Sequence, residues 1–136
     1  MQNRMSTIEE KLKGRSILIV DDDPRNTFAL VSYLEGLEMT IHTAGDGYRA
    51  IELLESSTVI DLVLMDMMMP EMDGYETIGR IRSSGTGVDI PIIAVTARAM
   101  KGDREKCLSA GASEYVSKPI NMHLLLEKMA NMLNPV

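Results

Sequence analysis

The sequence predicts an α/β domain in which a parallel sheet is covered by helices on both faces. Short apolar runs, most of them rich in β-branched residues, alternate five times with segments of helical periodicity. Each strand–helix unit is about as long as a right-handed crossover between parallel strands requires. The 136 residues suffice for one domain with a full hydrophobic core, without disulfides or a structural metal.

Composition narrows the class of protein. The chain is 45% hydrophobic and 25% charged, as in globular proteins, and it has no apolar run of about 18 residues that could span a membrane. A net charge of −6 disfavours direct nucleic-acid binding, because phosphate backbones attract basic surfaces. The amino terminus lacks an apolar signal core, and the single cysteine, Cys107, cannot form an internal disulfide, so we expect a cytoplasmic protein.

Residues 1–14 are expected to form an extension ahead of the domain proper, which covers 15–136. Ser6 and Glu9 fit a capping box, so residues 7–13 are predicted either as a short helix or as a frayed leader. The first strand, 17–20, is followed by three aspartates and a proline, with Asp23 as the cap of the next helix. That helix, 25–37, carries an apolar stripe of Ala29, Leu30, Tyr33, Leu34 and Leu37.

The remaining elements continue the alternation. Strands are predicted at 39–43, 62–65, 91–95 and 114–117. The inward faces of three further helices are predicted to be Ala50, Ile51 and Leu54, then Tyr75, Ile78 and Ile81, and finally Met122, Leu125, Leu126, Met129 and Leu133. Arg80 and Arg82 are predicted to point outward. The helix at 99–110 is polar along most of its length and is expected to be the least firmly packed element.

Polar side chains follow four of the five strands. Asp21 and Asp22 come after the first strand, Asp66 after the third, Thr96 after the fourth and Lys118 after the fifth. In a doubly wound sheet with the first and third strands adjacent, these residues converge on one crevice. Crowded carboxylates favour a cation, and Mg²⁺ binds a few carboxylates while leaving positions for water and phosphate oxygens. With a lysine and a hydroxyl nearby, the residues predict an aspartyl-phosphate site.

Five motifs carry these residues in a fixed order. They are Val20-Asp21-Asp22, Met65-Asp66-Met67-Met68-Met69-Pro70, Met72-Asp73-Gly74, Val95-Thr96-Ala97 and Tyr115-Val116-Ser117-Lys118-Pro119. Thr96 follows Asp66 by 30 residues and Lys118 follows it by 52. Over residues 15 to about 134, the chain resembles the receiver domain of two-component response regulators. The resemblance implies a flavodoxin-like (βα)5 fold with strand order 2-1-3-4-5.

The resemblance also implies a role for each residue of the motifs. Asp66 is the phosphoacceptor, Asp22 ligates Mg²⁺ directly, Asp21 helps to hold it, and Met68 contributes its backbone carbonyl. Lys118, Thr96 and the Ala97 amide bind the phosphoryl group, Tyr115 turns inward as Thr96 moves, and Pro119 follows a cis peptide bond. The methionines between 65 and 72 are interpreted as packing residues rather than ligands of a soft metal.

Partners follow from the same resemblance. A sensor histidine kinase or a histidine phosphotransfer protein donates the phosphoryl group, and Phe28 and Val31 form the expected patch facing it. Phosphorylation is expected to switch the surface of the helix at 99–110, the strand at 114–117 and the closing helix, where a downstream effector binds and a homodimer forms. The run 96–103 is similar to receivers of hybrid kinases; a stand-alone regulator is the other interpretation.

Three other functions fit parts of the pattern. A Mg²⁺ phosphatase of the haloacid dehalogenase type also uses an aspartate after its first strand, but Arg25 stands where that family has Thr or Val. A flavodoxin-like flavin carrier needs a Ser/Thr/Gly-rich phosphate loop where Asp21 and Asp22 stand. A pseudo-receiver that only mediates contacts does not need the complete set of residues. A switch that assists its own phosphorylation and dephosphorylation is expected, rather than a turnover enzyme.

Overall fold

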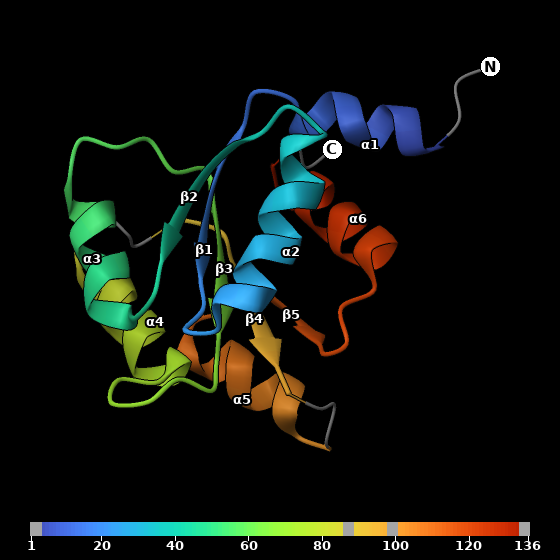
Figure 1. The fold of residues 1–136 in the computed structure, drawn as a ribbon. Coiled ribbons are helices and arrows are strands. Elements are labelled where there is room, and N and C mark those ends of the chain that lie inside the picture. Colours follow the sequence, from blue (N-terminus) through green and yellow to red (C-terminus); the bar gives the residue numbers. More distant parts are fainter. Residues whose placement is uncertain (1–3, 86–88, 98–100, 134–136) are drawn as a thin grey trace.

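The computed structural model describes residues 4–85, 89–97 and 101–133, and its parallel sheet has the strand order β2-β1-β3-β4-β5 (Figure 1). The strands are β1 (Ser16–Val20), β2 (Thr40–Ala44), β3 (Leu62–Asp66), β4 (Ile92–Thr96) and β5 (Glu114–Ser117). The helices are α1 (Arg4–Leu12), α2 (Pro24–Glu35), α3 (Gly47–Glu55), α4 (Gly74–Ser83), α5 (Asp103–Ala110) and α6 (Met122–Leu133). The predicted alternation and strand order are confirmed, and each strand lies within one residue of its predicted ends.

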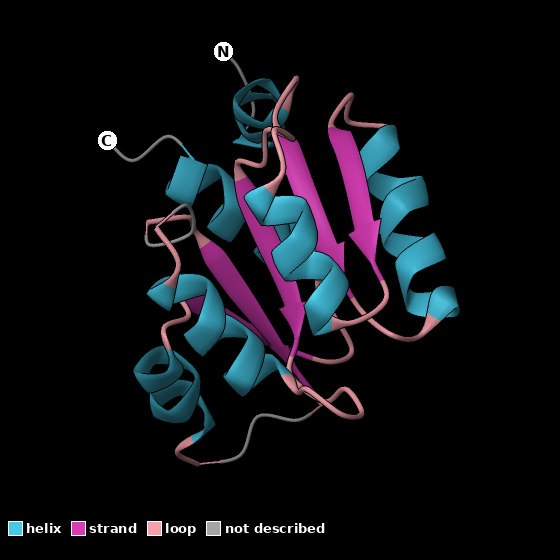
Figure 2. Ribbon diagram, turned by 90° about the vertical axis from the view of Figure 1, so that its left-hand side faces the viewer, coloured by secondary structure: helices cyan, strands magenta, loops and turns pink. Residues whose placement is uncertain are grey.

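Helices cover both faces of the sheet (Figures 1 and 2). Successive residues of β1 belong to different cores: Ile17 and Ile19 pack beneath α2 and α6, whereas Leu18 and Val20 pack beneath α3, α4 and α5. All four side chains are at most 1% exposed. A strand buried on both faces must be apolar at every position, which explains why the strands read as continuous apolar runs rather than alternating patterns.

Strand register brings the ends of β1 and β3 together. Val20 pairs with Met65 in the parallel ladder, so the chain continues into Asp21 and Asp66 at the same edge of the sheet. On the other side of β3, Asp66 pairs with Val95, and Thr96 pairs with Ser117 of β5. The residues predicted to converge therefore lie at one edge of the sheet, at the carboxyl ends of β1, β3, β4 and β5.

The amino-terminal segment is a helix that packs on the domain. Helix α1 begins at Arg4, ahead of Ser6, so the predicted cap at Ser6 is wrong. Ile8 and Leu12 are 6% and 0% exposed and belong to the core beneath α2 and α6. Figure 1 places α1 beside α6, at the end of the sheet where the strands begin. Apolar burial of this kind holds the segment in place, which a frayed leader would lack.

Three predicted orientations differ in the structure. Ala29 and Tyr33 are exposed, whereas the buried residues of α2 are Leu30 and Leu34, which face the sheet. Arg82 is half-buried instead of outward: its Nε donates to the carbonyl of Gly111 at 2.9 Å. This hydrogen bond satisfies a backbone carbonyl just before β5. The arginine side chain is long enough to reach that carbonyl from α4.

Of the helices that cover the sheet, α5 has the fewest buried residues. Within its bounds only Cys107 is buried, which agrees with its polar sequence. The predicted start at residue 99 lies outside the described residues, and the described helix begins at Asp103. Within the described part of the chain, no helix is both long and apolar enough to cross a membrane.

Candidate functional site

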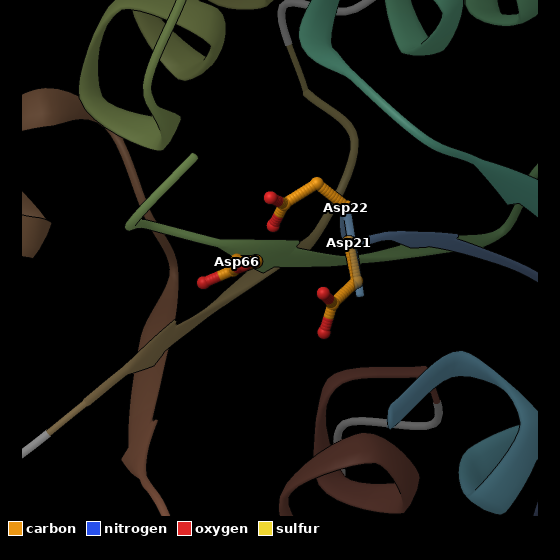
Figure 3. A group of neighbouring side chains, drawn as sticks. All are labelled: Asp21, Asp22 and Asp66. Atoms are coloured by element: carbon orange, nitrogen blue, oxygen red, sulfur yellow. The ribbon is translucent and has the colours of Figure 1, made fainter. Parts of the chain in front are cut away.

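Three carboxylates meet at the carboxyl edge of the sheet. Asp21 and Asp22 follow β1, and Asp66 ends β3 (Figure 3). One oxygen from each lies within 4.8 Å of the other two. Asp21 and Asp66 are 8% and 4% exposed, while Asp22 is open to solvent. Hard oxygen donors at this spacing, two of them sheltered and one exposed, fit a divalent cation such as Mg²⁺.

Local hydrogen bonds decide which of the consecutive aspartates face the site. Asp21 Oδ1 accepts from the amide of Asp23 at 2.8 Å, which fixes the carboxylate beside its own turn. Asp23 Oδ1 accepts from the amide of Arg25 at 2.9 Å and caps α2, with Pro24 at the first helical position as predicted. The third aspartate therefore serves the helix, and the first two are left for the cluster with Asp66.

Asp66 has two polar neighbours besides the acids. Its Oδ1 accepts from the amide of Met68 at 3.1 Å, and Lys118 Nζ lies 3.7 Å from the same oxygen. Lys118 follows β5, and the Lys118–Pro119 peptide bond is cis. An ammonium at this distance stabilises negative charge on a buried carboxylate. The structure thus brings Asp21, Asp22, Asp66 and Lys118 into one cluster.

The other predicted residues lie at the end of β4, in β5 and in the loop after β3. Thr96 is 5% exposed at the end of β4, one position beyond the residue paired with Asp66, and Ala97 follows it at the surface. Tyr115 is half-buried in β5 and packs against the core beneath α3, α4 and α5. The side chain of Met68 is 68% exposed.

The loop that leaves Asp66 is packed by methionines. Met67, Met69 and Met72 are 1%, 7% and 2% exposed, and Met65 in the strand is fully buried. These side chains fill the space between the loop and the sheet, as flexible thioethers do well. The interpretation of the methionines as packing residues agrees with their burial.

Gly74 allows the loop after β3 to close against the end of that strand. A Cβ at this position would lie 2.6 Å from Met67 Cα and 2.7 Å from the carbonyl oxygen of Asp66. We expect Gly74→Ala to lower the free energy of unfolding by about 1–3 kcal/mol or more, because both neighbours are backbone atoms that cannot turn aside. Urea denaturation followed by circular dichroism measures the change.

The matched control lies in the same helix. A Cβ at Gly79 would meet no atom within 4 Å, so Gly79→Ala should stabilise the domain by up to about 1 kcal/mol. Equal stability of the two variants would show that the close approach at Gly74 does not constrain the loop.

Burial dominates the electrostatics of Asp66. Burial, with smaller contributions from Asp21 and Asp22, raises the pKa of the Asp66 carboxyl to about 6, against the opposing effects of the Met68 amide and Lys118. Because the ordinary value is 3.8, the native domain binds this proton more tightly than the unfolded chain. Stability contributed by the protonated group is therefore lost as pH rises through about 4 to 6 and is absent above that range.

This linkage predicts that Asp66→Asn is more stable than the original chain when divalent cations are removed with EDTA. The gain at about pH 7.5 should be about 1–3 kcal/mol and should shrink at about pH 4.5, where the aspartate is largely protonated. Urea titrations at the two pH values measure both differences. A gain that does not depend on pH would rule out ionisation of Asp66 as its cause.

The pattern of apolar residues does not predict the cavity that lies beside the acids. A cavity of about 370 Å³ lies between α2 and the segment after β5, with Asp21, Asp66 and Lys118 among its lining residues. Its existence depends on how far α2 stands from that segment, which apolar periodicity does not specify. The exposure of Tyr33, which also lines it, has the same origin.

Comparison with known proteins identifies the family. Residues 17–130 match the model of the response regulator receiver domain. The chain belongs to this family. Its strand order and its acidic cluster are those predicted for a receiver, which is a phosphoacceptor switch and not a conventional enzyme. The phosphatase and flavin-carrier alternatives are thereby set aside.

The relatives of this receiver include sensor kinases. It is 40% identical to the sensor histidine kinase RcsC of Salmonella typhimurium over 114 residues, and this matched stretch covers 84% of this chain and 12% of the relative. It is 35% identical over 133 residues to the signal transduction histidine-protein kinase BarA of Escherichia coli K12, covering 97% of this chain and 14% of the relative. The chain thus spans only a small part of the length of these relatives.

Solved receivers share the fold. The receiver domain of sensor histidine kinase PA1611 from Pseudomonas aeruginosa PAO1 is 36% identical with a TM-score of 0.77, covering 87% of this chain and 95% of that one. In that structure a magnesium ion is coordinated in the active site cleft. A putative response regulator from Chloroflexus aurantiacus is 28% identical with a TM-score of 0.83, covering 89% and 98% of the two chains.

Proposed function

We propose that this receiver accepts a phosphoryl group on Asp66 in a Mg²⁺-dependent phosphorelay. The observation that carries the proposal is the position of the Asp66 carboxylate, which lies in one cluster with two further carboxylates and 3.7 Å from an ammonium group. A buried carboxylate held this way is a nucleophile, and the groups around it can neutralise the charge of an incoming phosphoryl group.

Asp21, Asp22 and Asp66, with the backbone carbonyl of Met68, would hold the Mg²⁺ ion. The spacing of the three carboxylate oxygens and the magnesium in the related PA1611 receiver support this assignment. When bound, the ion supplies positive charge for the phosphoryl oxygens. Asp22 is the exposed member of the set and is expected to ligate directly, while buried Asp21 helps to hold the ion.

In the transfer step an oxygen of Asp66 attacks phosphorus. A new oxygen–phosphorus bond forms, the bond to the donor breaks, and the bonding pair leaves with the donor, which is the imidazole of a phosphohistidine. Lys118 pairs with the phosphoryl group. The Thr96 hydroxyl and the Ala97 amide each donate a hydrogen bond to a phosphoryl oxygen.

The donor is a sensor histidine kinase or a histidine phosphotransfer protein. Phe28 is 74% exposed on α2 and lines, with Asp22 and Val31, a groove that begins at the acidic cluster. An exposed aromatic side chain next to the phosphoacceptor favours docking of an apolar surface from a donor protein. Val31 itself is half-buried and packs partly against the core.

Output passes through the face formed by α5, β5 and α6. Movement of Thr96 after phosphorylation would draw Tyr115 inward and change this face, to which a downstream effector or a second copy of the chain binds. We place the receiver at residues 15–136 behind the α1 extension, in a cytoplasmic protein, and its similarity to RcsC and BarA favours a hybrid kinase as its parent.

The test of this function is Mg²⁺-dependent labelling by a small donor. The purified chain should incorporate one phosphoryl group from acetyl phosphate with Mg²⁺ and none with EDTA, and it should not turn over p-nitrophenyl phosphate. Sustained ester hydrolysis that Asp21→Asn abolishes and Asp66→Asn retains would instead identify a phosphatase of the haloacid dehalogenase type.

A further inference from the structure

The cavity between α2 and the segment after β5 is apolar where it touches the sheet. Its floor consists of Ile19, Leu64 and Val95, which are 1%, 1% and 5% exposed. Leu30 of α2 and Ile120 after β5 line it from the two sides. These side chains belong to or pack against the core beneath α2 and α6, so the cavity is an opening of the hydrophobic core toward solvent.

One side of the same cavity is charged. Asp21, Asp66 and Lys118 are among its lining residues, so the phosphoacceptor carboxylate and its ammonium partner border the apolar space directly. A small apolar site with a few polar groups at one side is typical of sites for small molecules. With Mg²⁺ held by the acids, as proposed above, a ligand that matches the cavity carries an anionic phosphoryl end beside Lys118 and a compact apolar end.

We propose that this cavity binds the acyl chain of a small acyl phosphate donor, so that the receiver is phosphorylated more efficiently by butyryl phosphate than by acetyl phosphate. The proposal rests on the proposed function, because it names the leaving group of the reaction at Asp66. The phosphoryl end lies at Asp66 and Lys118, and the acyl chain extends over the floor of the cavity toward Leu30.

Volume and burial support a chain of about this length. An apolar cavity of about 150 Å³ is large enough for benzene, so a cavity of about 370 Å³ has room for a four-carbon chain. Each CH₂ group removed from water improves binding roughly three- to fourfold, so the two additional CH₂ groups of butyryl phosphate should raise kcat/KM roughly 10- to 15-fold.

The reaction is the same for both donors. An oxygen of Asp66 attacks phosphorus, the new oxygen–phosphorus bond forms, and the bond between phosphorus and the acyl oxygen breaks. The bonding pair leaves with that oxygen, giving acetate or butyrate. These two carboxylates have nearly equal basicity, so a difference in rate reports on binding of the chain and not on leaving-group chemistry.

The first experiment compares kcat/KM for the two acyl phosphates, with phosphoramidate as a donor that has no acyl chain. We expect the butyryl-to-acetyl ratio to be roughly 10 to 15 in the original chain and in Ser32→Phe, which adds a ring on an exposed position of α2 that does not line the cavity. In Ala29→Phe, where the ring is added at a lining residue, the ratio should fall to about one.

The outcomes separate the two proposals. Equal kcat/KM for the acyl phosphates, with normal labelling by phosphoramidate, would overturn the assignment of the cavity and leave the proposed function standing. No labelling by any of the three donors would overturn both.

A binding measurement does not depend on phosphoryl transfer or on the variants. Butylphosphonate, which cannot transfer its phosphorus, should shift the methyl resonances of Leu30, Val95 and Ile120, whereas methylphosphonate at the same concentration should leave them in place. Identical spectra with the two phosphonates would contradict occupation of the cavity by the chain.

Discussion

Asp66→Asn is expected to take up no phosphoryl group from acetyl phosphate in the presence of Mg²⁺, whereas the original chain takes up one. The neutral amide oxygen of asparagine is a poor nucleophile, and neither of the other acids in the cluster can replace Asp66, because only Asp66 combines burial with an ammonium 3.7 Å away. We expect the labelling rate to fall at least about 1,000-fold, the scale on which loss of a nucleophile acts. Phosphate incorporation after gel filtration measures the loss.

Asp73→Asn is the matched control for this substitution. Asp73 lies in the same loop, and its Oδ1 accepts from the amide of Glu76 at 2.9 Å as the cap of α4. Asparagine caps a helix about as well as aspartate, so the fold should be retained and labelling should be normal. Labelling of Asp66→Asn at the rate of this control would remove Asp66 from the phosphoacceptor role.

Asp22→Asn is expected to lower the affinity for Mg²⁺ by about 100-fold or more. Changes to groups that only support a metal ligand cost about 10- to 100-fold in affinity, and Asp22 is proposed as a ligand itself. Because Asp22 is exposed and follows β1, its replacement leaves both cores intact. Isothermal titration calorimetry measures the dissociation constant, and labelling by acetyl phosphate at low Mg²⁺ should weaken in parallel.

The adjoining Asp23 provides the comparison. Its carboxylate caps α2 rather than joining the cluster, so Asp23→Asn should leave the Mg²⁺ affinity within about twofold of the original value. Loss of affinity in Asp23→Asn with no loss in Asp22→Asn would show that Asp23 ligates the metal and Asp22 does not, which would contradict the proposed site.

The burial of Asp66 lowers the stability of the metal-free fold. A carboxyl whose pKa is raised to about 6 by burial weakens the metal-free fold when it ionises near neutral pH. A bound cation would offset that loss of stability by compensating the crowded negative charge. The same group therefore makes the metal-free fold less stable, and the proposed binding of Mg²⁺ and phosphorylation of Asp66 would each offset this effect.

Much of the site was predictable because parallel strands simplify the geometry. Once Ile17–Val20 and Leu62–Met65 are identified as buried strands, the polar residues that follow them must leave the sheet at one edge. The adjacency of these two strands is a different matter: it came from the resemblance to receivers, because apolar periodicity carries no information on strand order.

The features that were missed depend on side-chain reach and helix placement. Tyr33 fits the apolar period of α2 but faces the open cavity, because the helix stands away from the segment after β5. Arg82 looks like a surface charge in sequence, yet its guanidinium reaches the carbonyls of Gly111 and Ile90 from the end of α4. Neither distance is encoded in the local pattern of apolar residues.

Reductive trapping of the phosphorylated chain tests the central claim most directly. Borohydride converts an aspartyl phosphate to homoserine, which peptide mass spectrometry locates. Treatment with acetyl phosphate and Mg²⁺ followed by borohydride should give homoserine at position 66 and at no other aspartate. Homoserine at position 21 or 22, or incorporated phosphate that resists borohydride, would contradict the account.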